Sequence, residues 1–273
     1  MKKRSDALPE FEKPPLVEVV CDIQFEPLEN LIVPHIGLFW DSIKKDFPQI
    51  NQFEPILPIF EDFSNPYSKL RREDKIPTLI PRIWFVQKNQ NILIQVQNDR
   101  FILNWRKISA NDKYPRYEKV IEKFKIYLEM FRKFLIKNKI GDIKPIQYEM
   151  AYVNHIAKGS SWESLNDINQ LFPDFNWDTK NKEIFLGKID GINLQTRFEL
   201  PNQTGRLYIK IQDVFDSNKD HIIALEIKVR GIGTYKSYNS YEKWFDLAHQ
   251  WIVKSFASIT STNTQKNVWR RIK

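Results

Sequence analysis

The sequence is poor in cysteine and glycine, and this narrows the possible functions. A single cysteine, Cys21, stands among 273 residues, so neither a disulfide framework nor a cysteine-rich metal site can form within one chain. There are eight glycines, and no phosphate-binding loop, dinucleotide fingerprint or Gly-x-Ser-x-Gly elbow occurs. Nucleotide-driven chemistry is therefore disfavoured, and we expect no cofactor.

Long apolar runs are also missing, since none reaches the ~18 residues that a membrane span needs. Met1-Lys2-Lys3-Arg4 is followed by polar residues and not by a signal-peptide core, so we expect a cytoplasmic protein that contacts no membrane. The four histidines show no zinc-ligand spacing, which predicts no metal site. His249 shares a helical stripe with Phe245 and Ile252, and we expect a partly buried histidine hydrogen-bonded to a neighbour.

The composition is that of a folded, basic protein. Hydrophobic residues make up 42% of the chain, which is enough for a sizeable core. The net charge of +8 allows nucleic acid or an acidic protein as a partner and does not choose between them.

The hydrophobic pattern indicates antiparallel strands and amphipathic helices, an α+β fold. Strands with period-two alternation or short apolar runs are expected at 16–25, 82–87, 92–97, 100–106, 146–155, 184–200, 207–215 and 222–231. Apolar residues spaced by three and four predict helices at 30–47, 115–138, 162–172 and 241–261. Residues 48–81 contain six prolines and show no sustained period, so we expect no regular structure there.

In both halves of the chain the predicted order of elements is strand, helix, antiparallel strands and long helix. This suggests two related α+β halves, residues 1–140 and 141–273, which share one extended sheet or pack face to face and can form one compact domain.

The densest group of planar polar side chains lies where the central strand meets the next long helix. Two alternatives stay open for this cluster: a site for an anion or a carboxylate-bearing segment, or a structural network with Asp99 or Glu118 as its internal anion. The candidate binding residues are Arg100, Asn104, Arg106, Tyr114, Arg116 and Tyr117.

A second pattern resembles the PD-(D/E)xK nucleases, in which two carboxylates hold a divalent metal and a lysine polarises water. Asp213 precedes Glu226 and Lys228 at a similar spacing. Strand alternation, however, makes Glu226 and Lys228 ordinary solvated positions.

Three motifs resemble those of a sporadically distributed, uncharacterised prokaryotic family. They are the opening strand Pro14-Pro15-Leu16-Val17-Glu18-Val19-Val20, the central stretch from Asp99 to Tyr117, and the pair Ala248-His249 followed by Trp269. The resemblance implies an accessory subunit of antiviral defence or toxin–antitoxin loci. We therefore expect recognition without catalysis, with a protein encoded nearby as partner. A nucleic-acid-binding module using Trp40, Trp84 or Trp177 is the alternative, and a metal-dependent nuclease is a third.

Overall fold

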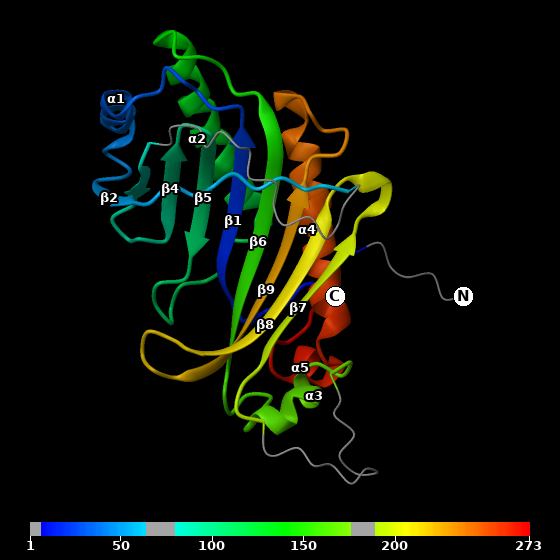
Figure 1. The fold of residues 1–273 in the computed structure, drawn as a ribbon. Coiled ribbons are helices and arrows are strands. Elements are labelled where there is room, and N and C mark those ends of the chain that lie inside the picture. Colours follow the sequence, from blue (N-terminus) through cyan, green and yellow to red (C-terminus); the bar gives the residue numbers. More distant parts are fainter. Residues whose placement is uncertain (1–6, 64–79, 176–188) are drawn as a thin grey trace.

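The computed structural model describes residues 7–63, 80–175 and 189–273 (Figure 1). Within them, nine strands form one antiparallel sheet in the order β2-β3-β4-β5-β1-β6-β9-β8-β7. The strands are β1 Leu16–Phe25, β2 Gln49–Phe53, β3 Arg82–Val86, β4 Ile92–Gln97, β5 Arg100–Arg106, β6 Pro145–Ala157, β7 Asn193–Glu199, β8 Arg206–Phe215 and β9 His221–Gly231. The helices are α1 Val33–Ile43, α2 Tyr117–Lys137, α3 Ile168–Leu171, α4 Tyr241–Ile259 and α5 Thr262–Asn267, with 3-10 turns at Leu165–Asp167, Pro201–Gln203 and Tyr238–Ser240. The expected α+β class is confirmed.

The two halves of the chain contribute to the sheet in the same way. In each half the first strand pairs with the last one, β1 with β5 and β6 with β9. The next neighbours are β4 and then β3 in the first half, and β8 and then β7 in the second. A long helix, α2 or α4, follows each last strand, and β1 pairs with β6 at the centre. The halves thus share one sheet, to which β2 adds an extra edge strand.

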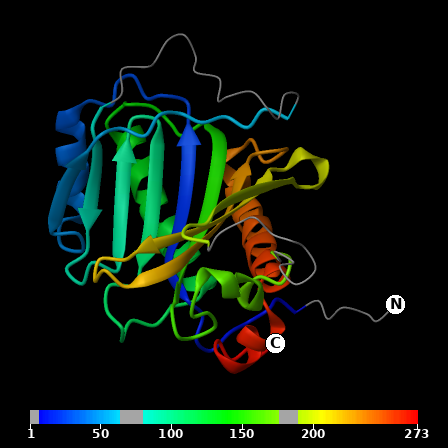
Figure 2. The same cartoon turned by 60° about the horizontal axis from the view of Figure 1, so that its bottom comes forward.

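One face of the sheet is apolar and packs against the helices. Alternation sends Val19, Cys21 and Ile23 of β1 to this face, where all three are fully buried. Helices α1, α2 and α4 lie over the same side (Figure 2). Phe124 of α2 contacts Phe101 of β5 and Phe245 of α4, with ring centroids 5.9 and 5.1 Å away. The core therefore lies between the sheet and this helical layer.

Most of the expected elements occur with ends shifted by a few residues. The 48–81 expectation was wrong in one part, because Gln49–Phe53 pairs with β3 as an edge strand. All five of its side chains are exposed, so burial imposes no hydrophobic pattern that a reader of the sequence could detect. The strand expected at 184–200 is β7 in its later part, and its first residues lie outside the described ranges.

Candidate functional site

The structure separates the predicted cluster into two groups on opposite sides of the sheet. Arg100, Asn104 and Arg106 alternate along β5 and point away from the helices. We call this side the polar face. Tyr114 and Arg116 belong to the loop after β5, and Tyr114 packs on Trp105, whose ring lies on the helical side at 5.3 Å. The six candidate residues therefore do not form one site.

On the polar face, Arg100 forms a buried ion pair. Nη1 of Arg100 lies 2.6 Å from Oδ2 of Asp22, and Nη2 donates to Oε1 of Gln24 at 2.8 Å. Both charged side chains are almost inaccessible, at 6% and 5% exposed. Burial raises the pKa of Asp22 to about 6, although Arg100 opposes the shift. The internal anion is thus Asp22 of the neighbouring strand, and the expectation of Asp99 or Glu118 was wrong.

Asn104 and Arg106, the other two candidates on the polar face, also contact neighbouring residues. Asn104 donates to Oε1 of Glu18 at 2.7 Å and accepts from Nε2 of Gln95 at 2.8 Å. The guanidinium of Arg106 lies 5.6 Å from the Trp84 ring centroid, and its Nη2 donates to the Gln90 carbonyl at 3.3 Å. These contacts bind β5 to its neighbours, although Nε of Arg100, Nε of Arg106 and Oδ1 of Asp22 are buried without a hydrogen-bond partner among the described residues.

An extended segment, residues 54–63, crosses the polar face, and we call it the strap (Figure 1). Side-chain amides of one cross-strand row hold its backbone. Gln97 receives the Ile56 N–H at 2.9 Å and donates to the Ile56 carbonyl at 2.8 Å, while Gln147 receives the Glu61 N–H at 2.9 Å. The Glu61 carboxylate accepts from Arg206 at 2.7 Å and from Tyr208 at 2.6 Å. The chain itself therefore occupies much of this face.

The nuclease-like residues do not converge. Glu226 and Lys228 lie on the polar face of β9, 2.9 Å apart, and Lys228 also lies 3.5 Å from Glu149. Asp213 pairs in register with the fully buried Ile223, on the opposite face, where it bonds the Ile192 N–H and His221. Among the described residues no group of three histidine, cysteine, aspartate or glutamate side chains is placed to hold a metal.

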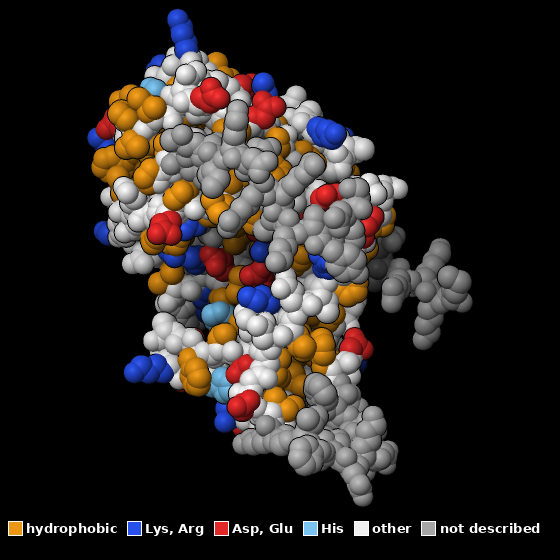
Figure 3. Space-filling view, viewed as in Figure 1, with side chains coloured by type: hydrophobic (Ala, Val, Ile, Leu, Met, Phe, Trp, Pro, Cys, Tyr) orange, Lys and Arg blue, Asp and Glu red, His pale blue; other side chains and the backbone are white. Residues whose placement is uncertain are grey.

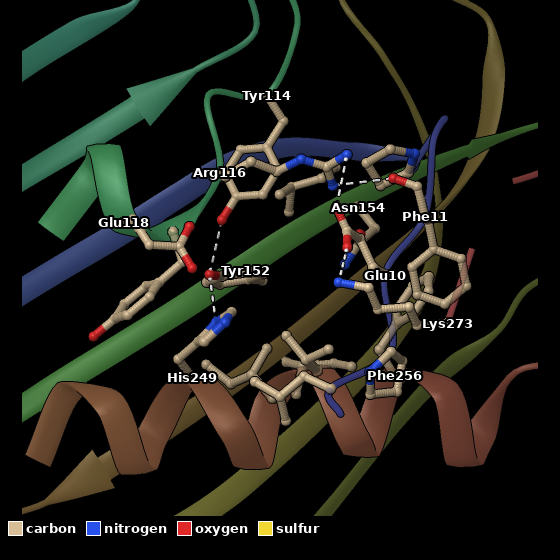
Figure 4. A pocket seen from close by; sticks show the side chains of 18 of the residues that line it. Glu10, Phe11, Tyr114, Arg116, Glu118, Tyr152, Asn154, His249, Phe256 and Lys273 are labelled. Atoms are coloured by element: carbon tan, nitrogen blue, oxygen red, sulfur yellow. Dashed lines mark hydrogen bonds and ion pairs between the residues drawn. The ribbon is translucent and has the colours of Figure 1, made fainter. Parts of the chain in front are cut away.

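Tyr114, Arg116 and Tyr117 line a pocket of about 370 Å³ (Figure 4). It lies between the start of α2, the middle of α4 and both ends of the described chain. We call it the α4 pocket. Its apolar wall includes Phe11, Leu16, Ile227, Ile252 and Phe256. Its polar residues come from segments far apart in the sequence, so the fold assembles it.

A chain of hydrogen bonds forms one wall of the α4 pocket. The hydroxyls of Tyr114 and Tyr152 are 3.0 Å apart, and that of Tyr152 lies 2.9 Å from Nδ1 of His249. Tyr117 stacks on the His249 ring at 4.1 Å and donates to Asp246 at 2.7 Å. Burial lowers the pKa of His249 to about 4 and raises the pKa values of Tyr114 and Tyr152 above their usual range. At neutral pH all three of these groups are uncharged.

Charged side chains stand on both sides of that wall. Glu10 bridges two cations, with Arg116 at 3.4 Å and Lys273 at 3.0 Å, and its pKa is lowered chiefly by the hydrogen bond from Lys273. Arg116 has a backbone φ of 75°, a left-handed value that is strained for a residue other than glycine, and its Nη1 donates to the Phe11 carbonyl at 3.1 Å. Glu118, in the first turn of α2, forms no hydrogen bond or ion pair with a described side chain.

Sequence reasoning found Tyr114, Arg116 and Tyr117 but missed Glu10, Tyr152 and Lys273. It expected His249 to be partly buried and hydrogen-bonded to a neighbour, and the intermediate exposure and the bond to Tyr152 confirm this. Only the sequence motifs pointed to residues on both sides of the pocket. The motif from Asp99 to Tyr117 contains Tyr114, Arg116 and Tyr117, and the motif Ala248-His249 contains His249. No spacing in the sequence indicates that residues more than 100 positions apart meet.

A third feature is an exposed apolar surface at the β2 edge of the sheet, which we call the edge surface (Figure 3). Ile32, Val33 and Leu38 at the start and along α1 are 50%, 55% and 57% exposed. Ile50 of β2 is 45% exposed on the helical side, next to Phe85 in the register. Phe53 is 40% exposed but lies on the polar face, where its ring packs on Trp84 at 4.3 Å, so it is not part of the edge surface. Among the described strands β2 pairs with β3 alone, so none of them occupies its outer edge.

No family model matches this chain, and no curated protein matches it. In the described part of the chain, no helix combines the length and hydropathy of a membrane span.

Proposed function

We propose that this protein acts by recognition, as a cytoplasmic protein-binding or regulatory subunit of a prokaryotic defence or toxin–antitoxin locus. Its partner is a protein encoded nearby. The observation that carries the proposal is the edge surface, where exposed apolar side chains adjoin a free strand edge.

Physical chemistry favours a protein as the occupant of the edge surface. Removing exposed aliphatic side chains such as Leu38 from water is favourable, and several of them on one surface are typical of an interaction site. The outer edge of β2 offers backbone donors and acceptors to an added strand of the partner. The net charge of +8 favours an acidic partner.

The α4 pocket supports binding over acid–base catalysis. An efficient general acid or base has a pKa near the working pH. The pKa of His249 is about 4 and those of Tyr114 and Tyr152 are raised, so these groups exchange protons poorly near pH 7. They remain suited to hydrogen bonding.

Co-expression with the product of the adjacent gene tests the proposal. We expect a complex that survives ~0.5 M salt, because protein interfaces bury apolar area as well as charge. Leu38→Asp or Ile50→Asp abolishes co-purification. The matched control is Phe198→Asp, which changes a 51%-exposed side chain on β7 at the opposite edge of the sheet. A complex unaffected by the first two variants, or lost equally with the control, contradicts the assignment of the edge surface.

One observation favours nucleic-acid binding as a second candidate function. Trp84 lies between two arginines on the polar face, with Arg82 at 5.5 Å and Arg106 at 5.6 Å from its ring centroid. Trp40 instead donates to the Phe47 carbonyl and packs on the core, and Trp177 lies outside the described residues. Binding through phosphates loses orders of magnitude in affinity over a few-fold rise in salt. A mobility shift with DNA or RNA that is tight at physiological salt, without a protein partner, would replace the first proposal by this one.

A further inference from the structure

The α4 pocket is lined by charged side chains of both signs, and Arg116, Lys273 and Glu118 are all accessible to solvent. Arg116 and Lys273 both pair with the carboxylate of Glu10, and their side chains are 41% and 58% exposed. Glu118 stands at the other end with no ion-pair partner among the described side chains. Figure 4 shows Glu118 on one side of the cavity and Glu10 with Lys273 on the other, with Tyr152 and His249 between.

This charge pattern selects for a particular class of small molecule. A simple anion would meet the Glu118 carboxylate, and a simple cation would meet Arg116 and Lys273, so each leaves one end of the pocket unsatisfied. A zwitterion offers a counter-charge to both signs, with its ammonium at Glu118 and its carboxylate beside Arg116 and Lys273.

The rest of the pocket suits an apolar side chain on that zwitterion. Ile227, Ile252 and Phe256 contribute apolar surface to its lining. A volume of about 370 Å³ falls in the lower part of the range of ligand sites and admits a side chain as large as phenylalanine. The hydroxyl–hydroxyl–imidazole chain can reverse its hydrogen-bond direction with the tautomer of His249, so it can serve a donor or an acceptor.

We propose that the α4 pocket binds a zwitterionic small molecule with an apolar side chain, such as a large neutral α-amino acid. This site is separate from the edge surface, so the proposal does not depend on the protein partner. Binding here would make the protein a ligand-responsive recognition subunit.

Calorimetry on the full chain alone, with three probes, tests the assignment. L-Phenylalanine carries both charges, phenethylamine only the ammonium and 3-phenylpropanoate only the carboxylate. We expect L-phenylalanine to bind at least about tenfold more tightly than either analogue, because each lacks one ionic contact. Absence of saturable binding by L-phenylalanine at ~10 mM overturns the proposal, as does an analogue that binds equally well.

Variants assign the two charges to residues. Glu118→Gln weakens L-phenylalanine at least about tenfold and leaves 3-phenylpropanoate unchanged, whereas Arg116→Gln weakens both probes. Glu122→Gln is the matched control, since Glu122 is exposed one turn later on α2 and pairs with Lys119 at 2.9 Å. Loss of binding in the control, or no loss with Glu118→Gln in a folded protein, rejects the proposed orientation. These readouts need no protein partner, so failure here is distinguishable from failure of the co-purification experiment.

Discussion

The polar face and the α4 pocket are both rich in charged and aromatic groups, yet they differ in how the charged groups are paired. On the polar face Arg100 is matched by Asp22 and Gln24, and Glu61 of the strap is matched by Arg206 and Tyr208. In the pocket the exposed Glu118 carboxylate has no ion-pair partner among the described side chains, and Arg116 and Lys273 share the single carboxylate of Glu10.

The comparison teaches that side-chain type alone does not mark a binding site. An arginine fork binds a carboxylate equally well whether the carboxylate belongs to a ligand or to the next strand. What distinguishes the two regions is that the chain supplies a counter-charge for the buried Arg100 of the polar face but none for Glu118, although some buried polar-face atoms such as Nε of Arg100 have no hydrogen-bond partner among the described residues. We therefore assign the polar face to stability and the pocket to binding, and the predictions that follow test this division.

The largest expected effect is on the buried ion pair of the polar face. Arg100→Met leaves Asp22 without its cation and should cost about 3–5 kcal/mol of unfolding free energy, measured by chemical denaturation. The double variant Arg100→Met, Asp22→Leu should recover much of that loss, because no unpaired charge stays buried. A loss below about 1 kcal/mol in the single variant would show that the pair is not structural.

Trp105→Ala should come next, with a loss of about 3 kcal/mol or more. Trp105 is 3% exposed on the apolar face of β5 and packs on Tyr114, so truncation opens a cavity between the sheet and the pocket loop. Thermal and chemical melting of the purified variant provide the measurement, and Trp105→Phe is the conservative control. A melting temperature equal to that of wild type would place this side chain at the surface.

His249 should make the pocket side of the protein sensitive to acid. Its pKa is lowered from 6.5 to about 4 in the folded state, chiefly by burial, so the unfolded state takes up the proton first. The stabilising contribution is complete above pH 6.5 and is lost as the pH falls towards 4. It amounts to about 3.5 kcal/mol at most, since one pKa unit corresponds to about 1.4 kcal/mol.

The matched measurement is the difference in unfolding free energy between wild type and His249→Gln across pH 4–7. Asp22, with its pKa raised to about 6, contributes with the opposite sign, because protonation favours the folded state as the pH falls. That contribution is common to both proteins and cancels in the difference. A difference that does not vary with pH would contradict a neutral, buried His249.

The smallest effects are expected at Glu226 and Lys228. Their ion pair is partly exposed, at 34% and 22%, and Lys228 keeps Glu149 as a neighbour. Glu226→Ala should change the unfolding free energy by about 1 kcal/mol or less. Both alanine variants should leave partner binding intact. Metal-dependent cleavage by wild type that disappears in both folded variants would revive the nuclease alternative.

The sequence predicted those features that rest on local periodicity. Alternation located β1 and β5, and the apolar stripe located α2, because one face of each element is buried against the core. It could not show that Tyr114 and Arg100 lie on opposite sides of the sheet, since the loop after β5 has no period. Nor could it join Glu10, Tyr152 and Lys273, whose meeting depends on the strand order and on the pairing of the chain ends through Phe11 and Arg271.

The measurement that tests the division between the two regions most directly is a crystal structure of the protein with L-phenylalanine. We predict the ligand in the α4 pocket, with its ammonium at Glu118 and its carboxylate beside Arg116. The strap should remain on the polar face, with Glu61 still bound by Arg206 and Tyr208. A ligand on the polar face with the strap displaced, or a pocket that stays empty at saturating L-phenylalanine, would contradict the account.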